Sequence, residues 1–362
     1  MPGQLSTSTP FLPLLHLCWQ WPDSDSDRKE LRSRMSVALT TPYPLLLTPD
    51  AGIVPPMREK AFRLYSTYLK QRFGGRVNKL SVDAGFGCPN REGGRDAQGC
   101  VFCDPGGSGS RKIARGESIA VQLEKSKEMM RRKYRAHRFI AYFQPFSNTY
   151  APVEQLRHCY DQALAVEDVV GLAVGTRPDC LSPEVLDLLE QYHQKTYFWL
   201  ELGLQSIHDK TLNYLQRGHD YACFLDSYQE AKARGLQVCV HLILGLPGET
   251  WDDVMTTADE MARLKVDGVK IHLLHVLEGT PLGELYKKGQ VPILEMQEYV
   301  ELAVDFIERL HPDTLIQRLT GDGPRNVLLA PLWSMNKWEV LNAIDAELER
   351  RGSSQGDKCR SG

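Results

Sequence analysis

From residue 58 onward, short and nearly continuous apolar runs alternate with longer segments in which apolar side chains recur at helical spacing. In residues 251–264 the apolar positions fall three and four residues apart, as on one face of an α-helix. Ser182 before Pro183 is typical of a helix start, and Thr250 with Asp253 forms a loose capping box. The pattern predicts strands at residues 79–83, 139–144, 170–175, 197–205, 237–244 and 268–276, and helices at 117–134, 152–166, 183–193, 222–234 and 251–264.

The order of these elements predicts an α/β fold. Strand–helix units follow one another with a period of about 30 residues, which is typical of βαβ connections. The strands are apolar almost throughout, and this indicates a parallel sheet covered by helices on its faces. The pattern by itself fits an open sheet and a barrel equally well.

The first 57 residues differ in character from the rest. They combine Ser/Thr/Pro-rich stretches with a short apolar patch and an acidic run. We therefore expect residues 1–57 to be a disordered extension, or the true start to be Met35 or Met57.

After the sixth predicted strand the regular alternation stops. Two amphipathic segments, residues 295–310 and 336–350, are joined by a Gly/Pro-containing stretch. We divide the chain into a core at 58–280, an extension at 281–350 that packs on the core and closes over its mouth, and a disordered tail at 351–362.

Composition excludes several classes of protein. Apolar residues make up 42% and charged residues 25% of the chain, as in ordinary globular domains. No run approaches the roughly 20 apolar residues of a membrane-spanning helix, so we expect no membrane partner. The net charge of −3 argues against wholesale electrostatic binding of nucleic acid, and any RNA contact would be a local patch. Most of the nine cysteines are scattered singly, which fits a reducing compartment, and we expect the cytoplasm.

Three cysteines gather in one glycine-rich loop after the first predicted strand. Eleven residues separate Cys88 from Cys100, and two separate Cys100 from Cys103. Thiolates grouped in this way select zinc or an iron–sulfur cluster. Three ligands rather than four leave one position free for a substrate or cofactor. A zinc knuckle completed by His137 or Asp104, or three bystander thiols on a surface loop, remain the alternatives.

Further segments accompany this loop, and together they resemble the radical S-adenosylmethionine (SAM) superfamily, whose three-cysteine loop holds a [4Fe–4S] cluster with one open iron. The commonest superfamily spacing is three residues and then two, so this chain keeps the second interval and lengthens the first. It resembles a bacterial family related to the radical domain of the Elongator catalytic subunit, some members of which are implicated in remodelling the side chain of tRNA wobble uridine. The segments that carry the resemblance are residues 142–152, 175–179, 201–206, 217–221, 241–250, 317–322 and 330–337.

The resemblance implies a partial (β/α)6 TIM-like barrel with a C-terminal helical extension, in which the chemistry lies at the carboxyl ends of the strands. It also implies that Cys88, Cys100 and Cys103 hold a [4Fe–4S] cluster whose open iron binds the amino and carboxylate groups of SAM. The reduced cluster would pass one electron to the sulfonium, and the resulting 5′-deoxyadenosyl radical would abstract hydrogen from the substrate.

Polar residues at the strand ends are then expected to hold SAM. They are Gln144 and Asn148 for its amino acid moiety, Thr176 and Arg177 for its carboxylate, Glu201 and Gln205 for its ribose, and the backbone from Gly245 to Glu249 for adenine. Three of these positions also have a simpler interpretation. Glu201 suits an interior salt bridge equally well, Arg177 suits a structural role at the barrel mouth, and the turn at Gly245 suits a tight strand-to-helix connection.

Other candidates lie outside these strand ends. Four histidines remain as titratable candidates: His219, His241, His272 and His275. Of these we expect His241 to line the pocket and to serve as the catalytic candidate, because imidazole suits proton transfer. Side-chain parity along the strands should decide whether His241 and His272 point inward.

Two further features are compatible with tRNA. The basic run at 125–138 would suit phosphates, although a solvated helix face explains it slightly better. Trp333 and Trp338, with Arg325 and Lys337 nearby, would suit a flipped base, and burial against the barrel is at least as good an explanation.

The favoured interpretation is a radical SAM enzyme that acts on a modified wobble uridine of tRNA and takes electrons from a donor such as flavodoxin or ferredoxin. The first alternative keeps the radical chemistry but places it on a small metabolite or a protein side chain. The second alternative, of another class, is a non-catalytic iron–sulfur or zinc binding module.

Overall fold

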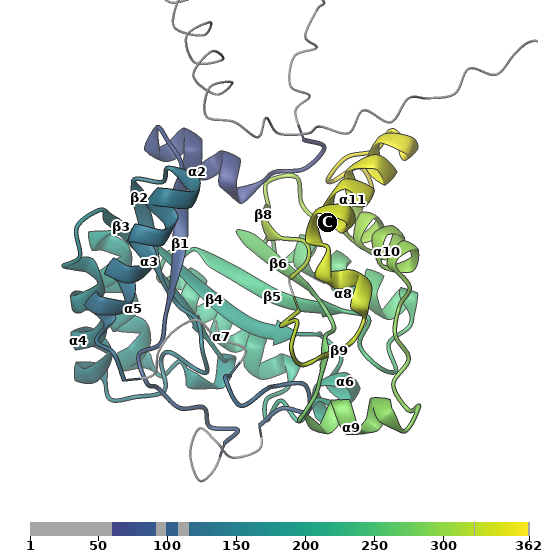
Figure 1. Cartoon of the computed structure of the whole chain (residues 1–362), viewed down its shortest axis with the longest axis horizontal. Coiled ribbons are helices and arrows are strands. Elements are labelled where there is room, and N and C mark those ends of the chain that lie inside the picture. The colour runs from purple at the N-terminus through teal and green to yellow at the C-terminus, as the bar shows by residue number, and fades with distance from the viewer. Residues whose placement is uncertain (1–59, 92–98, 108–115, 322, 361–362) are drawn as a thin grey trace, which may run out of the picture. The chain divides into compact units, whose positions relative to one another are not determined.

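The computed structural model describes residues 60–91, 99–107, 116–321 and 323–360. Within them, seven parallel strands form one curved sheet whose spatial order follows the chain (Figure 1). The predicted extension at residues 1–57 lies outside the described residues. The strands are β1 Val77–Val82, β2 Arg138–Phe143, β3 Val169–Thr176, β4 Tyr197–Gln205, β5 Val238–Leu244, β6 Gly268–Leu273 and β8 Leu315–Arg318.

Helices cover the outer face of this sheet. Apolar side chains of the strands, such as Leu80, Leu172 and Val240, pack with the helices into the largest core cluster. Figure 1 shows α3, α4 and α5 along one flank and α8, α10 and α11 along the other. The α-helices after β1 are α3 Ile119–Tyr134, α4 Val153–Leu164, α5 Pro183–Lys195, α6 Asp209–Tyr214, α7 Tyr221–Ala233, α8 Trp251–Arg263, α9 Pro281–Lys287, α10 Met296–Arg309 and α11 Lys337–Arg351.

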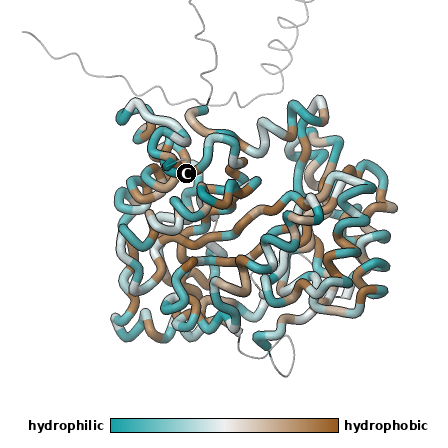
Figure 2. The backbone as a smooth tube through the Cα atoms, turned by 180° about the vertical axis from the view of Figure 1, so that it is seen from behind, coloured by the Kyte–Doolittle hydropathy of each residue, from teal (hydrophilic) through white to brown (hydrophobic). Residues whose placement is uncertain are grey.

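The predicted α/β class and the partial barrel are confirmed. Each of the six predicted strands and five predicted helices of the core is present, with ends that differ by a few residues. The predicted capping signals form as well: the Ser182 side chain accepts from Val185 N, and Thr250 and Asp253 make a reciprocal capping box. In Figure 2 the strands run through the middle as brown, apolar stretches, whereas the surrounding helices alternate in colour.

The segment after β6 differs from the prediction. The sixth strand ends at Leu273 instead of continuing to residue 276, and Val276–Leu277 forms a separate strand, β7, antiparallel to β9 Leu328–Ala330. The stretch expected to be a simple connection holds β8, the seventh strand of the sheet. Only Leu315 and Ile316 of β8 are apolar, so its four residues give no recognisable strand signal.

Helix α2, Tyr65–Phe73, lies at the amino ends of the strands, between the two edges of the sheet. It contacts both β1 and β8, which do not pair with each other. The Tyr65 ring packs edge-on against Trp199 with 5.5 Å between centroids, and Ile316 N donates to Arg63 O at 2.8 Å just before the helix. Helix α2 therefore closes the amino end of the barrel interior with aromatic side chains.

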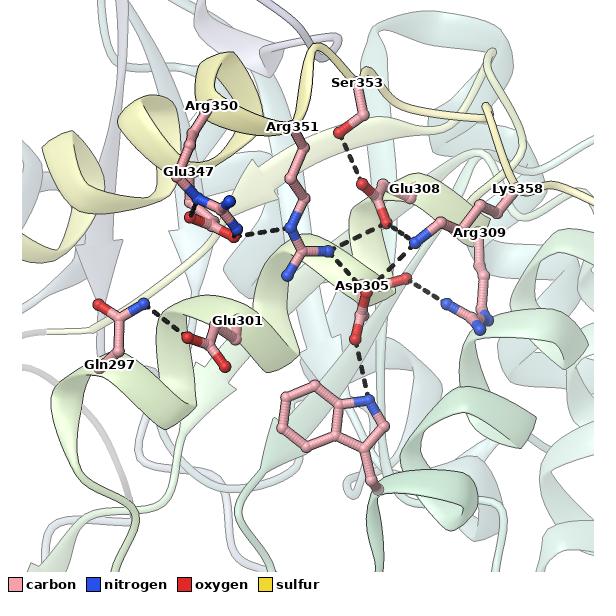
Figure 3. Close-up of polar contacts among 11 residues, drawn as sticks. Gln297, Glu301, Asp305, Glu308, Arg309, Glu347, Arg350, Arg351, Ser353 and Lys358 are labelled. Atoms are coloured by element: carbon pink, nitrogen blue, oxygen red, sulfur yellow. Dashed lines mark hydrogen bonds and ion pairs between the residues drawn. The ribbon is translucent and has the colours of Figure 1, made fainter.

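The C-terminal helices are joined by ion pairs rather than by apolar contact alone. Arg351 of α11 bonds the carboxylates of Asp305 and Glu308 on α10 and of Glu347 on its own helix (Figure 3). Lys358 also bonds Glu308, whose side chain is only 1% exposed. Helix α10 packs in turn against α8 and β5, so the network ties α11 to the outer layer of the barrel.

The prediction of a disordered tail is wrong for residues 351–360. The Gln355 side chain is buried: its oxygen accepts from Arg63 N at 2.9 Å, and its amide donates to the carbonyl oxygen of Thr314 at 2.8 Å. Lys358 N donates to Glu308 O. The polar composition of this stretch suggested disorder, but these side chains bond backbone groups of distant segments.

Candidate functional site

Alternate residues of each strand point into the barrel and form layers. The layer nearest the amino end is aromatic and includes Tyr65, Tyr197 and Trp199, whose polar atoms bond one another. The next layer is polar and contains Lys79 of β1, Tyr142 of β2, Glu201 of β4, His241 of β5 and Lys270 of β6. The barrel interior is thus aromatic at one end and charged in the middle.

Glu201 is the centre of the polar layer. Its carboxylate is fully buried; one oxygen lies 2.5 Å from Lys79 Nζ, and the other bonds His241 Nε2 at 2.8 Å and Lys270 Nζ. Burial opposes its ionisation, but Lys270, Lys79 and His241 outweigh burial and hold the pKa of Glu201 well below its usual range. Of the two interpretations left open for Glu201, the structure therefore favours the interior salt bridge.

His241 points inward, as does His272, and the two ring centroids lie 5.3 Å apart. Burial, together with the positive charge of Lys270, lowers the pKa of His241 to about 4 despite its bond to Glu201. A neutral imidazole that bonds a carboxylate through Nε2 must carry its proton on that atom, so Nδ1 is left as an acceptor. His241 lies in the barrel interior, and its role as a pocket-lining and catalytic residue stays a prediction.

The cysteine loop lies at the carboxyl ends of the strands. Gly87 O accepts from Ser147 N and Gly107 O from Phe146 N, both in the segment after β2. Val101 N donates to Leu215 O beyond β4. These backbone bonds fix Cys88, Cys100 and Cys103 at the edge where parallel-barrel proteins carry their chemistry.

Cationic side chains surround two of the three sulfur atoms. Arg217 Nη1 lies 3.2 Å from Cys100 Sγ, and Arg91 Nη2 lies 3.3 Å from Cys103 Sγ. Burial opposes ionisation of the Cys100 thiol, but Arg217 and Arg177 outweigh it, and the pKa of the thiol is lowered. Asn90 Nδ2 adds another donor 3.2 Å from the same sulfur.

These residues fit a thiolate-ligated cluster. N–H groups donate to the sulfur atoms of Cys100 and Cys103, and such donors are among the features that tune iron–sulfur clusters. Within the described part of the chain, no three His, Cys, Asp or Glu side chains are already arranged as a metal site, and this includes the cysteine trio. The three cysteines therefore fit a cluster through the chemistry of their sulfur atoms and the positive charge beside them.

Two predicted SAM residues follow β2. Gln144 Oε1 accepts from Ser81 Oγ at 2.8 Å. The Asn148 amide donates to the carbonyl oxygens of Phe143, Pro145 and Gly175, so it holds the ends of β2 and β3 together. Its Oδ1 is buried and has no partner among the described residues, which leaves one acceptor for a ligand.

Two more predicted residues end β3. Thr176 Oγ1 lies 2.6 Å from Thr149 Oγ1 inside the turn. Arg177 makes a paired contact with Asp179, from Nε at 2.9 Å and from Nη2 at 2.7 Å. Its Nη1 is buried without a partner in the described structure, and its charge acts on Cys88 and Cys100. Arg177 thus combines the structural role with one free donor beside the cysteine loop.

The ends of β4 and β5 have unusual backbone geometry. Gln205 has φ +78° at a break in register between β4 and β5, a conformation that side chains other than glycine adopt rarely. Gly245 has φ +81°, and a Cβ there would lie 3.0 Å from Leu294 Cδ1, so the turn after β5 requires glycine. Glu249 accepts from Ser206 Oγ, and burial raises the pKa of its carboxyl group.

Several residues that the structure brings to the site had no predicted role. Lys79 and Lys270 interrupt apolar strands at inward positions. This signal is recognisable once it is known which alternate residues of each strand point inward. Arg217 lies in a segment singled out for its resemblance and Arg91 in the cysteine loop, but only the folded loop shows that they contact sulfur.

The rim of the site holds a pocket. It is lined by Arg325, Leu332, Trp333, Met335, Asn336 and Glu339. Trp333 is partly buried: its indole N–H donates to Leu294 O at 3.1 Å, and its ring lies 5.6 Å from that of Tyr299. Trp338, in contrast, is 73% exposed. Because Leu294 also contacts the turn at Gly245, the pocket lies close to the carboxyl end of β5.

The basic run has a different position. The end of α3 leads into the start of β2, so residues 131–138 lie at the amino edge of the sheet, opposite the cysteine loop. Several of its cations are paired, including Lys127 with Glu124 and Arg131 with Asp168. The solvated helix face is therefore the better interpretation. Among the described residues, no helix has both the length and the apolar character that crossing a membrane requires.

Comparison with known proteins identifies the family. The model of the radical SAM superfamily matches residues 85–261, and that of the radical SAM C-terminal domain matches residues 266–350. The uncharacterized protein YtqA of Bacillus subtilis is 44% identical over 82% of this chain and 92% of its own length. A tRNA uridine(34) acetyltransferase of Methanocaldococcus infernus is 29% identical over 48% of this chain and 32% of its own.

A solved structure shows the same fold. The Elp3 protein of Methanocaldococcus infernus, with an N-terminal deletion, superposes with a TM-score of 0.60 at 18% identity, over 77% of this chain and 64% of that one. The two family matches, the similarity to YtqA and the cysteine loop all indicate the same family. The chain belongs to the radical SAM superfamily, whose enzymes use a [4Fe–4S] cluster and SAM.

Proposed function

We propose that this radical SAM enzyme holds its [4Fe–4S] cluster on Cys88, Cys100 and Cys103 and abstracts hydrogen from a modified wobble uridine of tRNA. The observation that carries the cluster assignment is the charge around the loop. Arg217 Nη1 and Asn90 Nδ2 lie 3.2 Å from Cys100 Sγ, and Arg91 Nη2 lies 3.3 Å from Cys103 Sγ. Three thiolates gathered on one cluster need such donors, because they repel one another.

When bound, the cluster and SAM supply reductive cleavage and hydrogen abstraction. The chain's own residues would bind and orient SAM. Arg177 Nη1 and Asn148 Oδ1, both buried and without partners in the described structure, are a free donor and a free acceptor near the loop. They suit the carboxylate and the ammonium of an amino acid, respectively. Thr176 and Gln144 end the same two strands, and Gln205, Gly245 and Glu249 would line the ribose and adenine side.

Support for tRNA comes from the relatives and from the rim pocket. The matched tRNA uridine(34) acetyltransferase acts, by its name, on the wobble position, and it shares 29% identity over 48% of this chain. In the rim pocket Leu332 is 58% exposed beside Arg325, and Trp338 next to it is 73% exposed. Exposed apolar and aromatic side chains next to a cation suit an unstacked base and its phosphate.

Anaerobic reconstitution tests the cluster and SAM chemistry. We expect about four irons per chain and formation of 5′-deoxyadenosine from SAM under reduction. Replacement of Cys100 or Cys103 by Ala should abolish both, whereas Cys239→Ala, a buried thiol of β5, should leave iron content unchanged. One tightly bound zinc per chain without SAM turnover would contradict the assignment.

Nucleoside analysis tests the substrate. tRNA from a strain that lacks the protein should accumulate a wobble uridine at an earlier stage of side-chain modification than tRNA from the parent strain. Complementation with the wild-type chain should restore the parent profile, and complementation with Cys103→Ala should not. An unchanged wobble-uridine profile would leave the radical chemistry in place and remove tRNA as the substrate.

A further inference from the structure

The middle of the barrel interior holds more positive than negative charge. Lys79 and Lys270 both bond Glu201, and Glu201 is the single carboxylate that they share in the described structure. Arg318, at the end of β8, adds a third cation. No carboxylate of the described residues lies within ion-pair distance of Arg318, although its charge acts on Tyr142, His241, Lys270 and His272.

A break in strand register brings two consecutive residues of β8 to this interior. Val269 pairs with Ile316, but Lys270 pairs with Arg318, so β8 contains one extra residue at this point. Such bulges re-aim side chains, often next to active sites. Gln317 Oε1 accepts from Lys79 Nζ at 2.6 Å, which fixes its side chain on the inner face. Arg318 stands opposite Lys270 on the neighbouring strand.

Both side chains keep donors free. Gln317 Nε2 is buried and has no hydrogen-bond partner among the described residues. A buried donor without a partner costs free energy, so an acceptor that reached it would be stabilised. Solvent reaches this interior, because the Lys79 and His241 side chains are 17% and 16% exposed. Arg318 is itself only partly buried.

We propose that Arg318 and the Gln317 amide, with Lys270 behind them, bind a carboxylate of the substrate inside the barrel. A guanidinium offers a planar pair of N–H donors, and the amide adds a third donor from the adjacent residue. A carboxylate also offsets the excess positive charge around Glu201. The proposal rests on the proposed function in one respect: with tRNA as substrate, the carboxylate belongs to the substituent of the modified uridine.

Two nucleosides that differ only in charge test the proposal. Binding of 5-carboxymethyluridine and of its amide, 5-carbamoylmethyluridine, is measured by calorimetry on the anaerobic enzyme loaded with cluster and SAM. We expect the acid to bind at least about 10-fold more tightly than the amide, the order that charge-assisted hydrogen bonds supply. Arg318→Gln should reduce this preference to about 2-fold or less, and Arg318→Lys should give an intermediate value. Arg132→Gln, an exposed position on α3, should keep the full preference.

The remaining outcomes separate the two proposals. Equal binding of acid and amide by the wild-type enzyme overturns the carboxylate site but leaves uridine as the substrate. If neither nucleoside binds, uridine fails, and acetate against acetamide at matched ionic strength decides the site. Acetate should then raise the Tm of the wild-type enzyme more than acetamide does, and it should not do so for Arg318→Gln. Equal Tm shifts of the wild-type enzyme with acetate and with acetamide overturn the carboxylate site. Loss of SAM binding in Arg318→Gln also overturns it, because Arg318 would then bind the cofactor.

Discussion

At the scale of single residues, the arginines near the cysteine loop differ in how strongly their positive charge should act on a bound cluster. Arg217 reaches Cys100 from the segment between α6 and α7, and its Nη2 also donates to Gly203 O at 2.6 Å on β4. It is 6% exposed, so its charge is little screened by solvent. Arg177, in contrast, is already paired with Asp179. Arg217 should therefore act on the cluster more strongly than Arg177.

Arg217→Met should make the reduction potential of the cluster more negative by roughly 50–100 mV, because the reduced cluster loses a nearby positive charge and a hydrogen bond to one ligand. The potential is measured by redox titration followed by electron paramagnetic resonance. Arg217→Lys should recover part of the shift, and Arg132→Met, on the exposed face of α3, should show none. An unchanged potential in Arg217→Met, at full iron content, would contradict a contact with the bound cluster.

The residue scale also shows how far the sequence could predict the site. The cysteine trio is recognisable from spacing and residue type alone, because ligand chemistry depends on those two properties. The role of Glu201 could not be decided, since its partners Lys79 and Lys270 lie 122 and 69 residues away along the chain. Arg318 was missed because its inward direction depends on a register break that no local pattern reveals.

At the scale of secondary-structure elements, long runs were predictable and short ones were not. The six core strands are long and apolar enough to show their period, whereas β8 has four residues and α2 has nine residues of mixed polarity. Both close the barrel: α2 contacts β1 and β8, and β8 adds the seventh strand. The residues after α11 act in a similar way, because their side chains bond the strand and helix ends around Arg63 and Thr314.

Deletion of residues 351–362 should therefore lower the free energy of unfolding by about 3–5 kcal/mol, the usual cost of leaving a buried charge without its partners. Glu308, 1% exposed, would lose Arg351, Ser353 and Lys358 together. Urea denaturation of the purified protein measures the change. Deletion of residues 361–362 alone is the matched control and should leave the urea midpoint of unfolding unchanged. Equal midpoints for the two deletions would mean that the segment packs without contributing to stability.

At the scale of the whole molecule, charge and aromatic surface lie at opposite ends of the barrel. The basic residues at the end of α3 are at the amino edge, whereas the cysteine loop and the rim pocket are at the carboxyl edge. Net charge is only −3, so the molecule as a whole exerts little long-range attraction on tRNA. A substrate that must present one base to the carboxyl edge would gain little from cations at the other end, because screening limits their reach to about 10 Å at ordinary salt.

This arrangement predicts which surface binds tRNA. Neutralising Arg132, Lys133 and Arg135 together should weaken tRNA binding less than about 3-fold at physiological salt, since these residues lie away from the rim. Trp338→Ala combined with Arg325→Gln should weaken it at least about 10-fold, because a stacking platform and a phosphate contact are both lost. Fluorescence anisotropy with unmodified tRNA gives both affinities. The exposure of all five side chains makes misfolding of either variant a small risk. Should the triple variant lose the greater affinity, the basic run would be the tRNA surface, and the rim pocket would serve another part of the reaction.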